Sequence, residues 1–351
     1  MEEIQNKVKN RYVGIDILRV FAIFSVIAVH FWSLNTPFLQ TDFDGSLSMF
    51  LQGMGHFFFQ LAVPLFLMIT GYLNGSKKTY SLSYVKGLGR VLKAYLFFSI
   101  LTFFFRRYYL HESLSVMDGV RYLLDFSLIR YGWYVEMWIG LYLLTPFLNL
   151  GYDALQSKSQ KRYLLLVLFV LSPLAFFFNR YGFVLLPKFW MNLHPIFFYV
   201  IGRYIREYQP CVSKPILVLS AFVPCLVNPI FSEVFVRNRP ILQIAGDSQS
   251  LFCCVQAIAF FLLIYKIDLK NVIFTRGLRM FSLLSLDMYL VCYMVDQMVY
   301  PWFLNVHFDS QQHFGWYFLV IVPVVFLISA LVSQLKCYLF RLFRLLHTFC
   351  S

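Results

Sequence analysis

Apolar stretches of about twenty residues recur along almost the whole sequence, and they constrain its fold more than any other feature. A helix of about twenty apolar residues is what crosses the hydrocarbon core of a bilayer. Of the 351 residues, 60% are hydrophobic and only 13% are charged, which leaves too few charged side chains to cover a water-soluble domain. The sequence therefore predicts an all-α, polytopic integral membrane protein, with a single membrane domain over residues 1–351 and no soluble domain.

Ten transmembrane helices are expected when the stretches are marked by this length. Their ranges are near 16–34, 55–73, 88–105, 132–150, 163–179, 192–208, 214–231, 250–267, 280–300 and 315–335. In this arrangement twenty Lys and Arg residues fall in the segments on one side of the membrane and eight on the other. Because basic residues favour the cytoplasmic side, the count predicts that both termini are cytoplasmic.

The positive charge and the cysteines exclude two kinds of partner. The net charge of +13 is spread between the apolar stretches rather than gathered into one stripe, as flanks of membrane helices are, so nucleic-acid binding is not expected. The seven cysteines form no CxxC pair and no cluster with His at metal-ligand spacing. No metal site is predicted.

The first helix carries three ionisable residues in a regular pattern. Arg19 and His30 are eleven residues apart, so on a helix they differ by only about 20° in azimuth and about 16 Å in height. Asp16 precedes Arg19 by one turn and can pair with it. Ionisable groups inside a membrane usually face the bundle interior and mark a site. A packed core histidine is the competing interpretation.

These residues and several other motifs resemble membrane acyltransferase family 3, whose members include acyltransferases that modify surface polysaccharides. Asp16, Arg19 and His30 match its Asp-x-x-Arg start and the His that follows after ten more residues. Further similar segments are 63–73, 133–134, 142–146 and 285–290. The resemblance runs from about residue 12 to the C-terminus, and the segment 133–142 looks most like capsule or wall-polysaccharide O-acetyltransferases.

The resemblance implies that acetyl-CoA is the acyl donor and that a glycan, or its lipid-linked precursor, is the acceptor. It also implies a multi-pass protein of a bacterial plasma membrane, surrounded by lipid, and leaves a homo-oligomer open. Arg19, Arg90 and Lys93 lie at expected cytoplasmic helix ends, where they could hold the phosphates of CoA. The competing explanation is the general excess of basic residues on the cytoplasmic side, which needs no ligand. Two residues depart from the family pattern. The family usually has Arg where this sequence has Lys93, and it often has a His near the position of Cys292.

His30 and Glu136 are the candidate catalytic residues, because both are expected in the outer third of the membrane. His30 would act as a general base on the acceptor hydroxyl or would carry the acyl group, and Glu136 would orient it. An interfacial Glu that reaches the headgroups is the alternative. Gln60, Tyr134 and Asp296 have similar expected depths and could line the same pocket, with core or interface packing as the alternative for each. The full set of substrate or pocket candidates is Asp16, Gln60, Trp133, Tyr134, Tyr289 and Asp296.

The expected function is thus an O-acyltransferase that moves an acyl group, acetyl in the first instance, from cytoplasmic acyl-CoA to a surface polysaccharide. The alternative is a transporter or flippase for a lipid-linked glycan. Such a protein would also need a polar interior, but the sequence lacks the internal repeat that transporters usually have.

Overall fold

A computed structural model describes residues 12–179, 184–235, 239–241 and 248–349. Its regular structure is helical, and among these residues the only bridge between extended segments pairs Asp42 with Pro240. The prediction of an all-α fold is confirmed for the described part of the chain.

The α-helices are α2 (Val13–Ser33), α3 (Leu47–Phe59), α4 (Ala62–Asn74), α5 (Leu82–Phe104), α6 (Val116–Leu124), α7 (Trp133–Ala154), α8 (Lys158–Phe169), α9 (Ala175–Asn179), α10 (His194–Tyr208), α11 (Lys214–Phe222), α12 (Val227–Phe235), α13 (Leu251–Ile264), α14 (Val272–His307), α15 (Gln311–Phe314) and α16 (Phe318–Phe349). The 3-10 segments are η1 (Pro37–Gln40), η4 (Lys188–Leu193), η5 (Val223–Leu226) and η6 (Gly315–Tyr317), and the π-helical segments are η2 (Phe105–Tyr109) and η3 (Val170–Leu174).

Seven helical stretches in the described residues are long and apolar enough to cross a membrane. They are Val13–Ser33, Leu47–Asn74, Leu82–Tyr109, Lys158–Asn179, Lys214–Phe235, Val272–His307 and Gln311–Leu342. All ten predicted ranges overlap helices, but α10 and α13, with 15 and 14 residues, reach only about 22 Å and 21 Å, short of a hydrocarbon core of about 30 Å. α7 is long enough but carries Glu136, Asn149 and Asp153. Ten spans and cytoplasmic termini therefore stay predictions.

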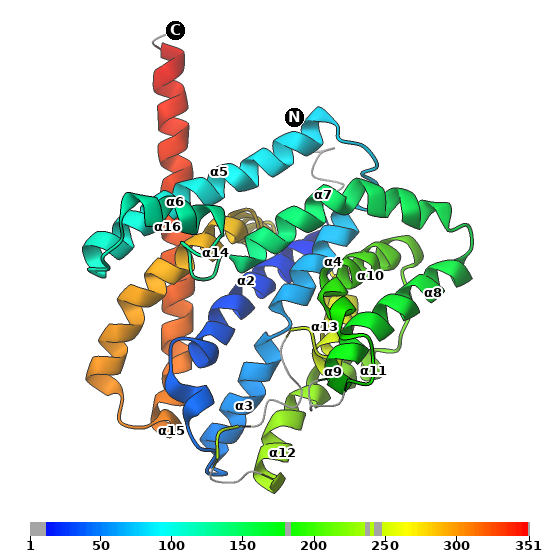
Figure 1. The fold of residues 1–351 in the computed structure, drawn as a ribbon, viewed down its shortest axis with the longest axis horizontal. Helices are drawn as coiled ribbons and strands as arrows, with labels where there is room; N and C mark the ends of the chain where they lie inside the picture. The colour runs from blue at the N-terminus through cyan, green and yellow to red at the C-terminus, as the bar shows by residue number, and fades with distance from the viewer. Residues whose placement is uncertain (1–11, 180–183, 236–238, 242–247, 350–351) are drawn as a thin grey trace.

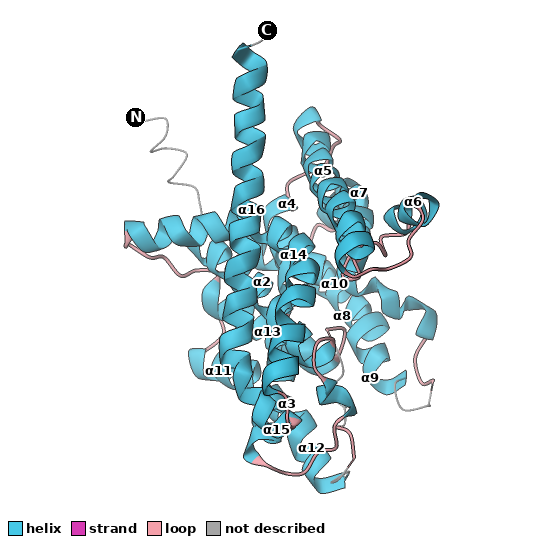
Figure 2. Ribbon diagram, turned by 90° about the vertical axis from the view of Figure 1, so that its left-hand side faces the viewer, coloured by secondary structure: helices cyan, strands magenta, loops and turns pink. Residues whose placement is uncertain are grey.

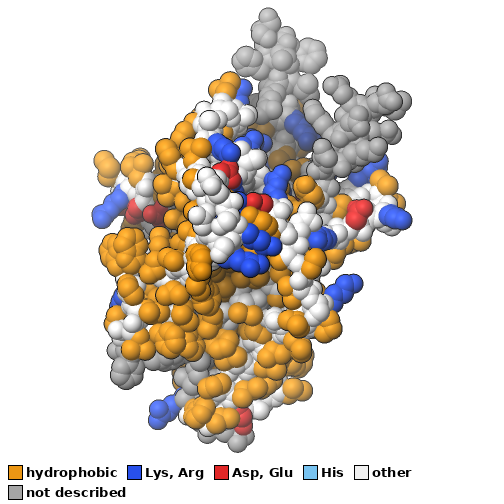
Figure 3. Space-filling model, turned by 90° about the vertical axis from the view of Figure 1, so that its right-hand side faces the viewer, with side chains coloured by type: hydrophobic (Ala, Val, Ile, Leu, Met, Phe, Trp, Pro, Cys, Tyr) orange, Lys and Arg blue, Asp and Glu red, His pale blue; other side chains and the backbone are white. Residues whose placement is uncertain are grey.

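The long helices form a bundle in which α2 and α4 lie at the centre, α14 and α16 on one side, and α10 and α13 on the other (Figure 1). The C-terminal part of α16 extends beyond the rest of the bundle, and α12 and α15 lie at the opposite end in both ribbon views (Figure 1 and Figure 2). On the face shown in Figure 3, hydrophobic side chains cover the middle and most Lys and Arg gather towards the end from which α16 projects. This distribution fits a surface that contacts lipid.

α2 divides the interior into two hydrophobic cores because it contributes to both. Its C-terminal part, including Ile27 and Phe31, packs with α14 and α16, whereas its N-terminal part, including Leu18, packs with α4, α10 and α13. Phe66 and Tyr134 pack against both cores. The two cores therefore meet at the junction of α2, α4, α7 and α14.

The second predicted span, 55–73, is interrupted in the structure. α3 ends at Phe59 and α4 begins at Ala62, so Gln60 and Leu61 form a break between two helices. Pro64 explains the break: it has no backbone N–H to bond the carbonyl of Gln60, and it lies in the first turn of α4, where helix N–H groups lack partners in any case. Such a break at membrane depth is tolerated where it is covered by protein or lines a cavity.

α4 and α10 cross at small residues that let the two backbones touch. A Cβ atom on Gly71 would collide with the backbone carbonyl of Tyr199, and one on Gly202 would collide with that of Met68. Close approach at small residues is how membrane helices gain packing energy, since lipid supplies little hydrophobic driving force between them. Gly71 and Gly202 therefore determine how closely α10 packs against the centre of the bundle.

Gly202→Ala should destabilise the protein by about 1–3 kcal/mol, because the added methyl group forces α4 and α10 apart. The matched control is Gly151→Ala on α7, where nothing lies within 4 Å of the added Cβ. Thermal unfolding of the purified protein in detergent would measure the difference. An unchanged unfolding temperature for Gly202→Ala would show that the close crossing is not a packing constraint.

Candidate active site

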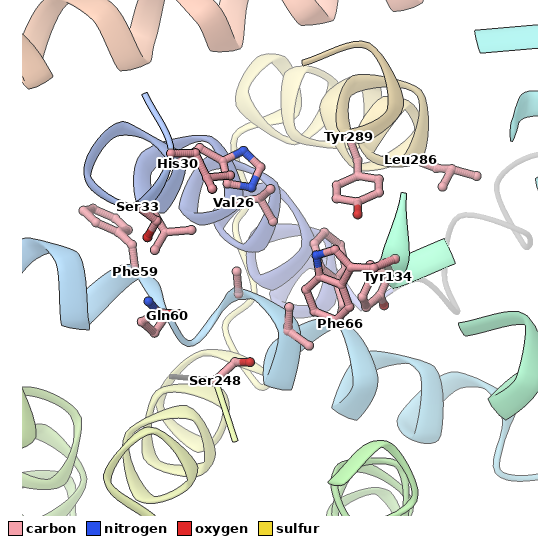
Figure 4. A pocket seen from close by; sticks show the side chains of 15 residues that line it. Val26, His30, Ser33, Phe59, Gln60, Phe66, Tyr134, Ser248, Leu286 and Tyr289 are labelled. Carbon is pink, nitrogen blue, oxygen red and sulfur yellow. The ribbon is translucent and has the colours of Figure 1, made fainter. Parts of the chain in front are cut away.

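A cavity of about 210 Å³ lies where the two cores meet. Its walls come from α2, from the break between α3 and α4, from the start of α7 and from α14, and they are mostly apolar (Figure 4). His30, Ser33, Phe59 and Gln60 lie at one end of the view, and Phe66, Tyr134, Leu286 and Tyr289 at the other. Trp133 and Ser248 also line it. Four of the residues predicted to form a pocket with His30, namely Gln60, Trp133, Tyr134 and Tyr289, are thus brought together around it.

His30 faces a buried carboxylate from another helix. Its side chain is almost wholly buried, and its Nδ1 atom lies 3.9 Å from Oδ2 of Asp296 on α14. Asp296 has no exposed surface. The two helices pack side by side, so residues 266 positions apart in the sequence meet inside the bundle.

Asp296 is held by two hydrogen bonds to the same oxygen. Tyr131 Oη and Asn35 Nδ2 each donate to Oδ2 at 3.0 Å. The Tyr131 ring also packs against the His30 ring, with 4.0 Å between ring centroids, and the backbone carbonyl of Tyr131 accepts a hydrogen bond from Tyr289 Oη. Tyr131 thereby connects the carboxylate, the imidazole and one wall of the cavity.

Two buried polar atoms of this pair have no hydrogen-bond partner among the described residues: His30 Nδ1 and Asp296 Oδ1. Fourteen such side-chain atoms occur among the described residues, and a catalytic role is one explanation for them. The 3.9 Å separation exceeds hydrogen-bond length by about 1 Å, and catalytic hydrogen bonds often tighten only when substrate binds.

The arrangement suits a general base. A carboxylate beside Nδ1 holds the imidazole proton on that nitrogen and stabilises the imidazolium that forms when the ring accepts a second proton. Nε2 is then the nitrogen available to a substrate hydroxyl in the cavity. Mostly apolar walls lower the local dielectric, which strengthens electrostatic interactions inside.

Arg19 and Asp16 lie further towards the N-terminal end of α2 and form a separate polar cluster with α14. Arg19 Nη1 donates to Ser282 Oγ at 3.0 Å, and Ser282 donates to Asp16 Oδ1 at 2.6 Å. Arg19 and Asp16 are 4.0 Å apart. The predicted pairing of Asp16 with Arg19 is thus present, and neither residue lines the cavity.

Four other predicted site residues lie outside the cavity lining, and one of them, Asp296, lies behind His30. Glu136 is exposed on α7, and Arg90 and Lys93 are exposed on α5. The carboxylate near His30 is that of Asp296, not that of Glu136. The depth argument misplaced Glu136 because depth says nothing about which face of α7 a residue occupies: Val135, its neighbour, is buried and Glu136 points outward.

Sequence reasoning missed Tyr131, Asn35 and Ser282. Each lies close to a motif that the sequence did reveal: Asn35 is five residues after His30, Tyr131 is two before Trp133, and Ser282 is three before Ser285. Their polar side chains at the edges of apolar stretches are a usable signal. Their partners could not be inferred, because each bond joins segments far apart in the sequence.

A family model described as an acyltransferase domain matches residues 12–334, nearly the whole chain. The chain belongs to the acyltransferase 3 family. The family and the apolar helices support a membrane acyltransferase, and the family favours this function over the alternative of a transporter or flippase. Neither the curated proteins nor the solved structures include one that matches this acyltransferase.

Asp296→Asn should lower the turnover of this acyltransferase by about 10² to 10⁴, because the amide keeps the shape but cannot stabilise an imidazolium. The measurement is transfer of labelled acetyl per mole of monodisperse protein. Asp287→Asn on the same helix is the matched control: Asp287 pairs with Lys336 at 2.6 Å outside the cavity lining, so its loss should affect stability and spare turnover. Equal turnover losses in the two variants would contradict the assignment.

Proposed function

We propose that this membrane acyltransferase moves an acetyl group from acetyl-CoA to a hydroxyl group of an extracytoplasmic polysaccharide or its lipid-linked precursor. The observation that carries the proposal is His30 in an apolar cavity with the buried carboxylate of Asp296 at its Nδ1 side. A sugar hydroxyl is a poor nucleophile at neutral pH, and a positioned base is the usual way to activate it. We assign His30 as that base and Asp296 as the group that orients it.

The size of the cavity limits how much of the donor it could hold. Pockets that hold a drug-sized ligand measure about 300–1,000 Å³, so a cavity of about 210 Å³ suits the reacting end of the donor, the acyl thioester, rather than all of CoA. The nucleotide would stay outside, towards the N-terminal end of α2. Arg19 lies in that direction along α2, and Arg90 and Lys93 on α5 keep their charges exposed, as phosphate contacts require.

The steps of the reaction follow from this placement. His30 Nε2 takes the proton of the acceptor hydroxyl as its oxygen attacks the thioester carbon. The tetrahedral intermediate then expels the CoA sulfur, which receives the proton from His30. The base is neutral again, and one acetyl ester has replaced one thioester. Capsule and wall polysaccharides supply hydroxyl groups of this kind, and a bacterial plasma membrane separates them from cytoplasmic acetyl-CoA.

His30→Gln should abolish transfer, with turnover reduced by about 10² to 10⁴, while the protein still folds. The assay is transfer of labelled acetyl from acetyl-CoA to the glycan fraction per mole of monodisperse protein. A packed core histidine would behave differently, since its loss would reduce stability and leave turnover per folded molecule intact. Turnover above about a tenth of wild type would exclude His30 as the base.

We also propose ten membrane crossings, with both termini and the donor on the cytoplasmic side. In a Cys211→Ser background, which removes an exposed native thiol, Asp309→Cys between α14 and α15 should react with an impermeant maleimide in intact cells. Thr79→Cys between α4 and α5 should react only after the membrane is permeabilised. The reverse pattern would show that the protein has the opposite orientation in the membrane. Labelling of both sites in intact cells would contradict the ten-helix topology.

A further inference from the structure

Besides His30, polar side chains at the His30 end of the cavity include Ser33 on α2 and Gln60 at the break between α3 and α4 (Figure 4). Both contact the same atom of a second buried histidine. His56 Nε2 lies 3.0 Å from Ser33 Oγ and 3.2 Å from Gln60 Nε2. His56 is 2% exposed and does not line the cavity itself. The reaction steps above give this buried histidine no role.

The direction of these bonds follows from what each group can do. The amide nitrogen of Gln60 can only donate, so His56 Nε2 accepts, and the proton of the neutral ring is on Nδ1. An amide NH2 group carries two hydrogens, and His56 takes one of them. The second makes no hydrogen bond to any of the described residues, and the side chain lines the cavity.

The backbone break is what brings this amide to the cavity. In a continuous helix Gln60 would follow the helical phase of α3, but α3 ends at Phe59 because Pro64 prevents its continuation. Gln60 therefore lies at a bend between two helices, with Phe59 and Ala62 also lining the cavity. His56, one turn earlier on α3, then fixes the rotation of the amide.

We infer that Gln60 is a further catalytic residue, whose free amide N–H donates to the oxyanion of the tetrahedral intermediate, and that His56 is the positioning residue that aims it. This inference rests on the proposed function. When the acceptor oxygen bonds to the thioester carbon, the π electrons of the C=O bond move to its oxygen, which becomes negative; they return when the carbon–sulfur bond breaks. A preorganised N–H donor in a water-poor cavity stabilises that oxygen most when it is charged, and so raises kcat rather than affinity.

The test uses the full-length protein purified in detergent, with [14C]acetyl-CoA as donor and membranes from cells lacking the gene as the acceptor source. Gln60→Leu should lower kcat by about 10² to 10³ and leave the KM for acetyl-CoA unchanged. Gln60→Met, which keeps the length of the side chain, should do the same and serves if the Leu variant does not fold. Gln256→Leu is the matched control: that buried amide bonds Ala221 O and Cys225 Sγ on the far side of α13, and its loss should spare kcat.

The positioning role of His56 is tested by comparing kcat between His56 and Gln60 variants. His56→Phe should lower kcat less than Gln60→Leu does, and His56→Gln, whose amide oxygen can accept, should restore much of it. Because the two residues act as one unit, the double variant Gln60→Leu/His56→Phe should be no slower than Gln60→Leu alone. Additive losses, or a His56→Phe variant that loses stability with kcat intact, would make His56 a packing residue and overturn its assignment.

His30→Gln measured in parallel separates this inference from the proposed function. Transfer that is lost in His30→Gln but kept above about a tenth in both Gln60 variants would overturn the oxyanion assignment alone. A raised KM with unchanged kcat would also overturn it, since the amide would then bind substrate and transition state equally. Absence of transfer by the wild-type protein would overturn both.

Discussion

A carboxylate with no exposed surface has to be satisfied by protein groups, and in this acyltransferase that requirement determines which helices meet. Asp296 lies inside a bundle that faces lipid, where an unpaired charge costs several kcal/mol. Its partners are Asn35 just after α2, Tyr131 just before α7, and His30 on α2. The segment before α7, the end of α2 and the interior of α14 are therefore joined at one point, and the cavity opens beside it.

Several other charged pairs in the structure are shorter than the His30–Asp296 pair and hold helices together. Lys336 with Asp287 and Lys161 with Glu207 are both 2.6 Å apart, so each charge is fully neutralised by its partner. Arg203 likewise binds Asp153 and the carbonyl and side chain of Asn149. These pairs clamp neighbouring helices. The His30–Asp296 pair is longer, at 3.9 Å, keeps two unsatisfied atoms and lies beside the cavity.

The break between α3 and α4 likewise positions a polar group, Gln60, at another wall of the cavity. A single proline, Pro64, divides what would be one long membrane helix, and the free end places Gln60 opposite α2. Polar groups at a broken helix are costly in hydrocarbon, so the surrounding aromatic side chains, Phe59 among them, have to cover them. The cavity thus lies at the place where the membrane helices are least regular.

Much of the fold follows from the sequence because each membrane helix is formed by interactions between residues close together in the sequence. Hydrogen bonds within each helix satisfy its backbone, so length and apolar content suffice to predict the all-α bundle, and the helical period suffices to put Arg19 and His30 in phase. The boundaries were less predictable: α14 runs from Val272 to His307, beyond the predicted 280–300, because a helix can continue into water once its apolar part ends.

The sequence alone also determined that His30 is a candidate base and that Gln60, Tyr134, Tyr289 and Asp296 are candidates for its surroundings. Only the tertiary structure decided that Asp296 rather than Glu136 is the carboxylate beside it. The reason is physical: depth in a membrane can be counted along a helix, but the direction of a side chain depends on how that helix is rotated against its neighbours. That rotation is set by packing between residues far apart in the sequence, such as Gly71 against Tyr199 and His30 against Tyr131.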